Sequence, residues 1–352
     1  MRQHYVGMDV HQASTSIAVM NGQGRLISES LIETKAQTIV DFLKGLSGEV
    51  LVTFEESNQA AWLYDLIQPH VTRLTVCNPH HNHLLKSGNK SDRVDARKLA
   101  QLLRAGMLRP VYHGEHGTRT LKELVRSYEC LVEDTSRVKN RIKAIYRGRG
   151  VGTRGRAVYQ TSQRELWLRK IESAGLRNRA ELLFRQLDQL QVLRREAKRA
   201  MIKESRRQVA TQLLQQIPEL GPVRIAQIVA TVGTPHRFRS KRQFWSYIGL
   251  AVITRSSADY RLVDNRMQKH RLAAQNRGLN RNYNHRLKSV FKAAALGAAH
   301  SEAYREYYER LVTAGSRAEL ARLTLARKLA ATVLAVWKSG ERFAAEKVMS
   351  TA

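Results

Sequence analysis

The spacing of apolar residues changes near residue 121, and this change restricts the folds open to the 352-residue chain. Before it, apolar residues alternate with polar or small ones, so that Val6, Met8 and Val10 fall on one side of an extended segment. After it, apolar residues recur at alternating steps of four and three, which is the heptad spacing of packed helices. The chain therefore combines an N-terminal region that contains strands with a longer helical region.

Residues 1–110 show strands that alternate with helices. Asn21 and Gly22 suit a tight turn between two strands, and Pro69 ends a short helix. We expect strands at residues 5–10, 15–20, 25–32, 50–55 and 74–77, and helices near residues 37–46, 62–66 and 91–103. The order βββαβαβα predicts an α/β RNase-H-like domain at residues 1–110. In that fold the first three strands form a meander, and helices cover both faces of a mixed sheet.

Two heptad-spaced segments follow, at residues 124–145 and 183–201. The Gly- and Arg-rich residues 147–156 between them are interpreted as a flexible basic loop that joins two long antiparallel helices. Heptad spacing produces a seam, a line of apolar side chains along one face of a helix. Packing of two helices within one chain and packing across a dimer interface both explain such seams. We assign residues 111–206 to a helical, coiled-coil-like linker or oligomerisation segment. Residues 207–345 form a mainly α-helical C-terminal domain that begins with a helix, a tight turn and a helix.

Four carboxylates lie in the N-terminal region. Asp9 is in the middle of the first expected strand, opposite its apolar neighbours, and Glu55 ends the strand at residues 50–55. Asp92 and Asp95 are three residues apart in an expected helix, so they share one helix face. In an RNase-H-like sheet, adjacent central strands bring the first two acids together and the last helix crosses over them. The four carboxylates are therefore expected to converge.

Converging carboxylate oxygens suit Mg²⁺, a hard cation that retains waters and also binds phosphate. A metal ion there can activate an attacking oxygen and stabilise a leaving one. Two assignments stay open. Asp92 follows Ser91 and could simply cap the helix. Glu56 could replace Glu55, although strand alternation favours Glu55.

The positive charge is concentrated beyond residue 110. The chain has a net charge of +30, of which residues 1–110, with 12 basic and 10 acidic side chains, contribute only +2. A field of this size attracts polyanions and releases their counterions on binding. We therefore expect the C-terminal two thirds of the chain to bind nucleic acid.

Other features limit the cellular location. No apolar run approaches the roughly 20 residues that span a bilayer, and the N-terminal residues do not resemble a signal peptide. Cys77 and Cys130 are far apart and lack the spacing of a disulfide framework or a thiolate zinc site. These features predict a cytoplasmic protein without a membrane partner.

Several motifs together resemble one family. GNKSDRVDARKLAQLLRAG, with MDVH near the N-terminus and FEES after a strand, resembles the DEDD-type transposases of bacterial insertion sequences, the recombinases guided by a bridge RNA. IPELGPV, RFRSKRQFWSYIGLAVITRSSADY and RGLNRNYNHRLKSVFKAAALGAA extend the resemblance through residues 207–340. Each motif is weakly specific, but the combination is highly specific.

The resemblance implies that residues 1–110 form a RuvC-like catalytic domain, and it implies a set of catalytic residues. The family's four acids fall on Asp9, Glu55, Asp92 and Asp95, and its serine nucleophile falls on Ser257, with Ser256 as the alternative. Ala258 stands where family members usually have glycine. Ser257 would attack a DNA phosphodiester and form a phosphoserine link, with Mg²⁺ at the acids.

The resemblance also implies partners. A guide RNA would select donor and target DNA by base pairing. The serine and the acids would meet across an interface between protomers, so the active form would be a homo-oligomer, either a dimer or a tetramer. This assembly would associate with the nucleoid when it acts. From the residues themselves, the expected nucleic-acid contacts lie beside the acids and in a basic stretch interpreted as helical, and they are Lys90, Arg93, Arg277, Arg281, Arg286 and Lys288. Two alternatives stay open: the stretch could be a solvated helix face, and Lys90 and Arg93 could only balance the local charge.

Two other functions remain open from the residues. The same four acids would serve a metal-dependent DNA junction nuclease that uses water, and in that enzyme Ser257 would be dispensable. A basic RNA-binding protein without catalysis would need neither the acids nor Mg²⁺. Loss of strand cutting in Ser257→Ala or Asp9→Ala variants separates these alternatives.

Overall fold

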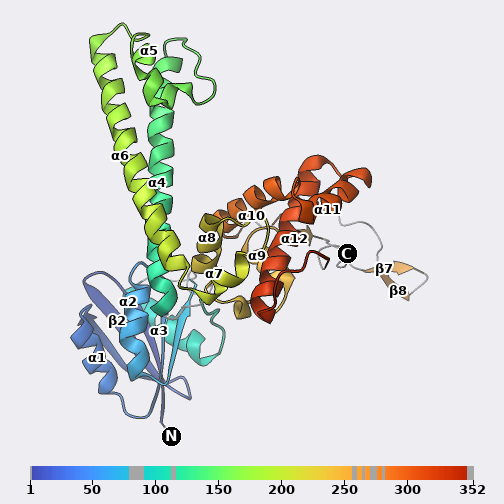
Figure 1. Ribbon diagram of the computed structural model, residues 1–352. Coiled ribbons are helices and arrows are strands. Elements are labelled where there is room, and N and C mark those ends of the chain that lie inside the picture. Colours follow the sequence, from blue (N-terminus) through green and yellow to red (C-terminus); the bar gives the residue numbers. More distant parts are fainter. Residues whose placement is uncertain are drawn as a thin grey trace. The chain divides into compact units, whose positions relative to one another are not determined.

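The computed structural model describes residues 2–78, 91–111, 116–255, 260–263, 266–269, 276–279 and 282–346. The chain divides into two compact units, Met1–His113 and Gly114–Ala352 (Figure 1). The base of the long helical hairpin shares a core with the helices that follow it, so the second unit contains both. The finer division at residues 110 and 206 stays a prediction.

The first unit is built on a five-stranded mixed sheet with the strand order β3-β2-β1-β4-β5. The strands β1 (Gln3–Val10), β2 (Ser14–Asn21) and β3 (Leu26–Glu33) form an antiparallel meander, as the sequence predicted. The strands β4 (Glu49–Glu55) and β5 (Arg73–Cys77) extend the sheet in parallel with β1. The intervening helices are α1 (Ala36–Lys44), α2 (Ala60–Ile67), a 3₁₀ turn η1 (Gln68–His70) and α3 (Asp92–Arg104).

The two faces of this sheet are covered by different helices. Val6 and Met8 point into a core that includes Ile39 of α1 and Leu63 of α2. On the other face, α3 packs so closely on β1 that a Cβ atom at Gly7 would lie 2.2 Å from the carbonyl oxygen of Ala96. Only glycine fits there. The close approach sets the first turn of α3 beside the end of β1.

The second unit begins with a long helical hairpin of α4 (His116–Arg147) and α6 (Ala174–Ser205) (Figure 1). Predicted seam residues Val138, Ile142 and Ile145 of α4 are buried with Phe184 and Leu187 of α6. This part of the seam is therefore covered within one chain. The basic loop leads into further helical turns, η3 (Ala157–Tyr159), η4 (Thr161–Gln163) and α5 (Arg164–Leu168).

The remaining helices pack around one apolar core, to which Ile225, Phe291 and Leu329 contribute fully buried side chains. They are α7 (Val209–Leu214), α8 (Pro222–Val232), the turn η5 (Pro235–Arg237), α9 (Lys241–Tyr247), α10 (His285–Ala298), α11 (Glu302–Thr313) and α12 (Ala318–Ser339). None of the helices within the described ranges is long and apolar enough to cross a membrane.

Four short strands interrupt this helical region, which the sequence did not predict. They form two antiparallel pairs, β6 (Val252–Arg255) with β9 (Asn276–Leu279) and β7 (Tyr260–Val263) with β8 (Arg266–Lys269). The expected basic helix is wrong for Arg277, which lies in β9. The helix α10 begins only at His285, because the side chain of Asn284 accepts a hydrogen bond from the Leu287 amide and caps it.

Candidate metal centre

The ends of β1 and α3 bring two of the predicted acids together. Asp9 lies on the face of the sheet that α3 covers, since it alternates with the buried residues Met8 and Val6. Asp92 is the first residue of α3. The hydroxyl of Ser91, not the Asp92 carboxylate, accepts the hydrogen bond from the Val94 amide. Ser91 therefore caps the helix and leaves the Asp92 carboxylate available for another role.

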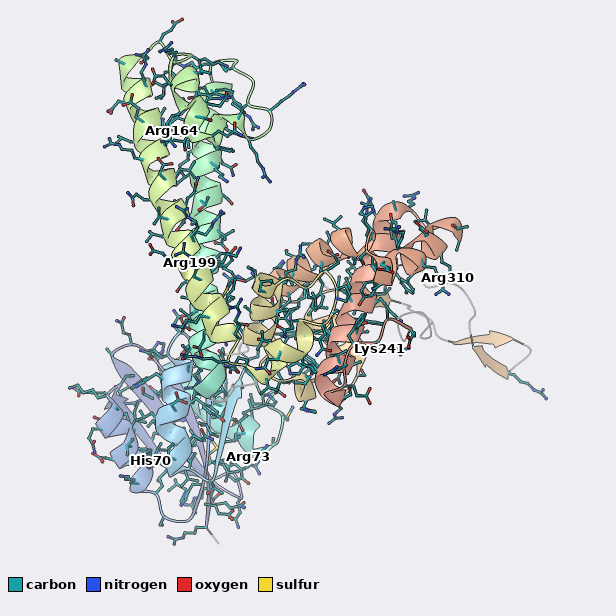
Figure 2. All side chains as sticks on the ribbon, viewed as in Figure 1. His70, Arg73, Arg164, Arg199, Lys241 and Arg310 are labelled. Atoms are coloured by element: carbon teal, nitrogen blue, oxygen red, sulfur yellow. The ribbon has the colours of Figure 1, made fainter. Side chains whose placement is uncertain are left out.

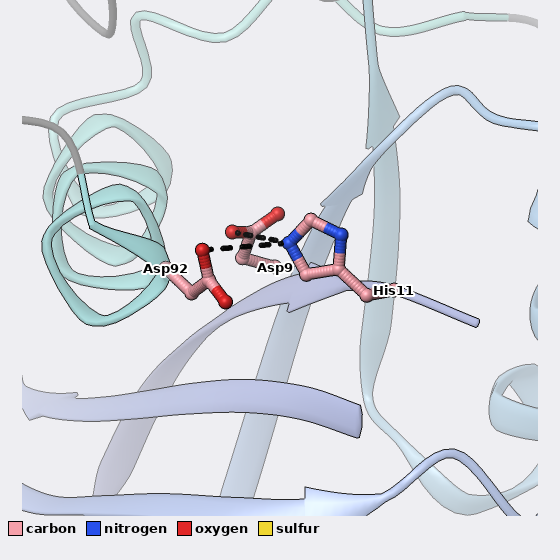
Figure 3. Close-up of side chains that lie close together, drawn as sticks. All are labelled: Asp9, His11 and Asp92. Carbon is pink, nitrogen blue, oxygen red and sulfur yellow. Dashed lines mark ion pairs between the residues drawn. The ribbon is translucent and has the colours of Figure 1, made fainter. Parts of the chain in front are cut away.

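A histidine that the sequence analysis missed completes this cluster (Figure 3). His11 lies just after β1, and its Nε2 atom is 3.3 Å from Asp9 Oδ2 and 3.6 Å from Asp92 Oδ1. One ligand atom from each of the three side chains lies within 4.8 Å of the others. The signal was present in the MDVH motif, because His11 stands two residues after Asp9 and strand alternation gives both the same side.

Asp95 adds a third carboxylate nearby. One turn along α3 from Asp92, its Oδ1 atom is buried and accepts no hydrogen bond from the residues that the structure describes. Lys98 Nζ lies 3.9 Å from this oxygen. Burial raises the pKa of Asp9, and the charges of Asp92 and Asp95 raise it further, while His11 partly opposes them. Like charges at this site therefore repel one another in the absence of a cation.

Glu55 lies on the same sheet face but not in the close group. Met8 of β1 pairs with Phe54 of β4, and Asp9 and Glu55 are the next residues on these parallel strands. Both carboxylates therefore emerge on the α3 side, as alternation predicted. Within the described ranges, the group within 4.8 Å comprises Asp9, His11 and Asp92, without Glu55 or Asp95. Glu56 is exposed beyond the strand end.

The donors fit a divalent cation. Three carboxylates with mutually repelling charges gain stability when a cation is placed among them. The buried Oδ1 of Asp95 accepts no hydrogen bond from the described residues, and Lys98 Nζ is 3.9 Å away, so this oxygen can still bind a cation. His11 adds a nitrogen ligand to the carboxylate oxygens. Sites with both nitrogen and oxygen ligands accept Mn²⁺ as well as Mg²⁺.

We expect His11→Ala to weaken Mn²⁺ binding by about tenfold, and Mg²⁺ binding by less, because an imidazole nitrogen suits transition metals better than Mg²⁺. Isothermal titration of the purified protein with each ion measures both affinities. Gln12→Ala, at the exposed neighbouring residue, is the matched control. Equal Mn²⁺ affinities in the wild type and His11→Ala would show that His11 is not a ligand.

The other predicted residues have different placements. Ser257, Ser256, Lys90 and Arg281 lie outside the described residues, as does the side chain of Arg277. Arg93 is exposed on α3. Hydrogen bonds from Arg97 lower the pKa of Glu29, and the charge of Arg93 lowers it by a smaller amount. Lys288 Nζ lies 4.0 Å from the centre of the Tyr283 ring.

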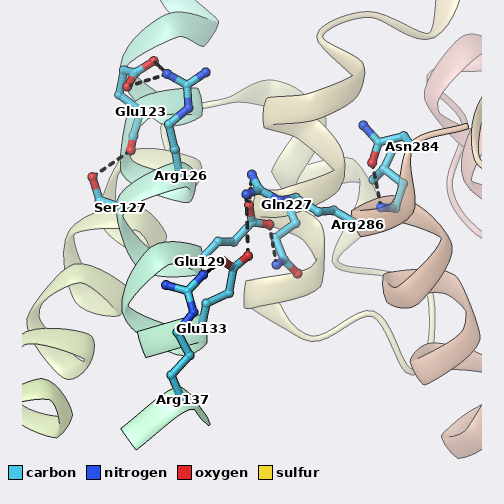
Figure 4. Close-up of polar contacts among 10 residues, drawn as sticks. Glu123, Arg126, Ser127, Glu129, Glu133, Arg137, Gln227, Asn284 and Arg286 are labelled. Carbon is cyan, nitrogen blue, oxygen red and sulfur yellow. Dashed lines mark hydrogen bonds and ion pairs between the residues drawn. The ribbon is translucent and has the colours of Figure 1, made fainter. Parts of the chain in front are cut away.

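Arg286, an expected nucleic-acid contact, is bound within the protein (Figure 4). Its Nη1 atom lies 2.6 Å from Glu129 Oε2 on α4, and Nη2 lies 3.8 Å from Glu133 Oε1. The Gln227 amide donates to the other oxygen of Glu129 at 2.9 Å. Burial raises the pKa of Glu129, and Arg286 and Gln227 partly offset this. A phosphate would have to compete with Glu129 for Arg286.

We expect Arg286→Met to lower the free energy of unfolding by about 1–3 kcal/mol at pH 7, because it leaves the buried Glu129 charge without its cation. The effect should shrink as the pH falls toward the raised pKa of Glu129, since the protonated acid needs no partner. Urea unfolding measures it. The control Arg126→Met breaks an exposed 3.0 Å pair with Glu123 and should cost at most about 1 kcal/mol. Equal costs in both variants would contradict the role assigned to Arg286.

Comparisons with known proteins identify the family to which the chain belongs. A model of the DEDD domain of IS110, described as a transposase, matches residues 6–148 and so includes the strand and helix that hold the acidic cluster. A second model, described as transposase of the IS116/IS110/IS902 family, matches residues 211–309. No curated protein matches the chain. A DEDD domain of this kind implies a divalent metal, which the clustered donors fit. The two models together match well over half of the chain, which therefore belongs to the IS110 family of transposases, enzymes that act on DNA.

Proposed function

We propose that this transposase cuts and rejoins DNA strands through a covalent phosphoserine intermediate, at a Mg²⁺ site held by four acids. The convergence of Asp9, Asp92 and His11 supports the proposal most directly, together with the buried Oδ1 of Asp95, which accepts no hydrogen bond from the described residues. Glu55 would complete the set from the adjacent parallel strand. A cluster of mutually repelling carboxylates has little purpose in folding, and it has a clear one in binding a cation beside a phosphodiester.

We interpret the first unit as an RNase-H-like domain. The strand order β3-β2-β1-β4-β5, with three antiparallel and two parallel strands, supports this interpretation. Helix α3 crosses the sheet over Gly7 and brings a ligand oxygen of Asp92 within 4.8 Å of one of Asp9. The acids thus sit on the central strand, on its parallel neighbour and on the helix above them.

In the proposed reaction, the Ser257 oxygen attacks a DNA phosphorus. A new phosphorus–oxygen bond to serine forms, the bond to the 3′ oxygen breaks, and the proton that the Ser257 hydroxyl gives up ends on the freed 3′-hydroxyl. A 3′-hydroxyl of the exchanged strand then attacks the phosphoserine, re-forms a phosphodiester and returns the proton to Ser257. Bound Mg²⁺ would polarise the scissile phosphate and stabilise charge on oxygen. Asp9, Glu55, Asp92 and Asp95 would hold it there.

We further propose that a guide RNA selects the donor and target DNA, and that the active form is a homo-oligomer in the cytoplasm, at the nucleoid. The net charge of +28 beyond residue 110 supports binding to more than one nucleic-acid strand. Ser257 and the acids belong to different compact units of the chain, and assembly would make catalysis depend on both.

A covalent adduct tests this function. Purified protein is incubated with the guide RNA, target DNA and Mg²⁺, and the products are separated under denaturing conditions. The proposal predicts a protease-sensitive protein–DNA adduct that maps to residues 256–257. Cutting without an adduct would instead identify a metal-dependent nuclease that uses water. Binding without cutting, with or without Mg²⁺, would contradict the proposed chemistry.

A further inference from the structure

The far end of the α4–α6 hairpin concentrates positive charge. We define the hairpin tip as residues 139–179, which contain twelve Lys and Arg but only two Glu. Figure 2 shows side chains projecting all around this end of the hairpin, with Arg164 labelled among them. The tip is thus a strongly cationic surface that the proposed cutting chemistry does not use.

Some of these cations hold the tip together. Arg164 makes a bidentate pair with Asp188, with distances of 2.7 and 2.8 Å. Arg177 donates twice to the Ile171 carbonyl oxygen, and Arg147 donates to the Thr153 hydroxyl. These side chains are structural, and they fix the loop and short helices to the hairpin.

Other cations at the tip have no polar partner in the part of the chain that the structure describes. The side chains of Arg149, Arg154 and Arg156 in the loop, and of Arg141 on α4, are exposed and form no hydrogen bond or ion pair among the described residues. Burial lowers the pKa of the neighbouring Lys139, and the charges of Arg194 and Arg156 lower it further. The cations therefore repel one another, and an anionic partner would relieve the repulsion.

The aromatic side chains of the tip are covered. Tyr146 and Trp167 are buried against each other, with ring centroids 5.0 Å apart. Lys139 and Lys143 lie over the Tyr159 ring at 5.2 and 5.4 Å. Proteins that bind single strands present aromatic rings on which bases stack. The tip presents cations without such a platform, which fits the phosphate backbone of a duplex.

We propose that the hairpin tip binds the phosphates of double-stranded DNA without sequence preference, through Arg149, Arg154, Arg156 and Arg141. DNA is favoured over other duplexes because the chain is a DNA transposase. The tip would add contacts to the phosphate backbone of the DNA that the transposase holds. This proposal depends neither on Ser257 nor on RNA guidance, so it stands or falls separately from the proposed chemistry.

The test compares two triple variants of equal charge. Arg149→Gln/Arg154→Gln/Arg156→Gln removes three unpaired loop cations. The control, Arg126→Gln/Arg137→Gln/Arg207→Gln, removes three cations that are paired with acids at 3.0, 2.9 and 2.9 Å. Fluorescence anisotropy with a random duplex of about 30 base pairs at several salt concentrations gives affinity and its salt dependence.

For the tip variant, the slope of log affinity against log salt should fall by about 2 to 3, since each phosphate contact contributes about 0.9. In the control variant, the magnitude of this slope should fall by less than about 1. Arg141→Gln, on the regular helix α4, should lower the magnitude of the slope by about 1. Because this substitution does not touch the loop, its effect cannot come from misfolding of the loop. Equal losses in the tip and control variants would overturn the proposal. The same measurement with duplex RNA of equal length provides a second check. A fall in slope for the tip variant that is seen with RNA but not with DNA would also overturn the proposal.

Discussion

Asp9→Asn is expected to abolish strand cutting while the protein stays folded. The neutral amide keeps the shape of the side chain but loses the charge that would hold a cation among Asp92, Asp95 and Glu55. Several kcal/mol of transition-state stabilisation come from a catalytic metal, and each 1.36 kcal/mol is a factor of ten in rate. A loss of at least about 100-fold in the rate of cutting is therefore expected. A gel assay with labelled DNA measures it.

The same variant should be as stable as the wild type, or more stable, in the absence of metal. Burial and the neighbouring carboxylates raise the pKa of Asp9 in the folded protein. Because the pKa of Asp9 is higher in the folded protein than in the unfolded chain, protonated Asp9 favours folding. This contribution to stability is complete at a pH below the unfolded pKa, and it is lost as the pH rises through the folded pKa. At pH 7 the ionised Asp9 thus destabilises the metal-free fold, and asparagine removes that penalty.

Urea unfolding in the presence of a chelator checks this expectation. The advantage of Asp9→Asn should be present at pH 7, should shrink as the pH falls through the raised pKa of Asp9, and should be gone below the ordinary pKa of an aspartate, where Asp9 of the wild type is protonated in both states. Asp41→Asn, at an exposed acid on α1 that binds Gln37, is the control and should cut DNA normally. A large loss of stability in Asp9→Asn would mean that Asp9 is structural and would remove the reason to assign it to catalysis.

Ser257→Ala is expected to eliminate both the covalent adduct and the cut strand. Removal of a serine nucleophile from serine enzymes costs on the order of 10⁶ in rate, so no product should be detectable in this assay. Binding of DNA and of Mn²⁺ should be unchanged, because the clustered acids belong to the first unit and Ser257 to the second. Denaturing gels with labelled DNA measure the adduct and the cut strand. Filter binding of the same DNA measures DNA binding, and isothermal titration measures Mn²⁺ binding.

Ser256→Ala is the matched control, because it removes an identical hydroxyl one residue away. It should retain the adduct if Ser257 is the nucleophile. If Ser256→Ala loses the adduct and Ser257→Ala keeps it, the assignment moves to Ser256. If both variants still cut DNA, the water-dependent nuclease becomes the better account, since its reaction needs only the acids.

Much of the first unit follows from local patterns. The alternation along residues 6–10 predicted both the first strand and the face of the sheet on which Asp9 lies. The structure confirms the meander and the order of the elements. The three-residue step from Asp92 to Asp95 required only helix geometry. These patterns succeed because burial on one face of a strand or helix leaves a regular spacing in the sequence.

Features that depend on packing between distant segments could not be predicted. Which oxygens lie within a few ångströms depends on how closely α3 approaches β1, and a single glycine, Gly7, controls that distance. Glu129 lies far from Arg286 in the sequence, so neither residue revealed that the arginine is already paired. The short strands were hidden because charged residues such as Arg261 and Arg266 obscure the alternation.

The most direct test of the account is the position of a divalent ion in crystals of the full chain grown with Mn²⁺, found by anomalous scattering. The account predicts a peak between the carboxylates of Asp9 and Asp92, within reach of His11 and Asp95, and loss of that peak in Asp9→Asn. No peak at this place in the wild type, with Asp9 and Asp92 still facing His11 alone, would contradict it.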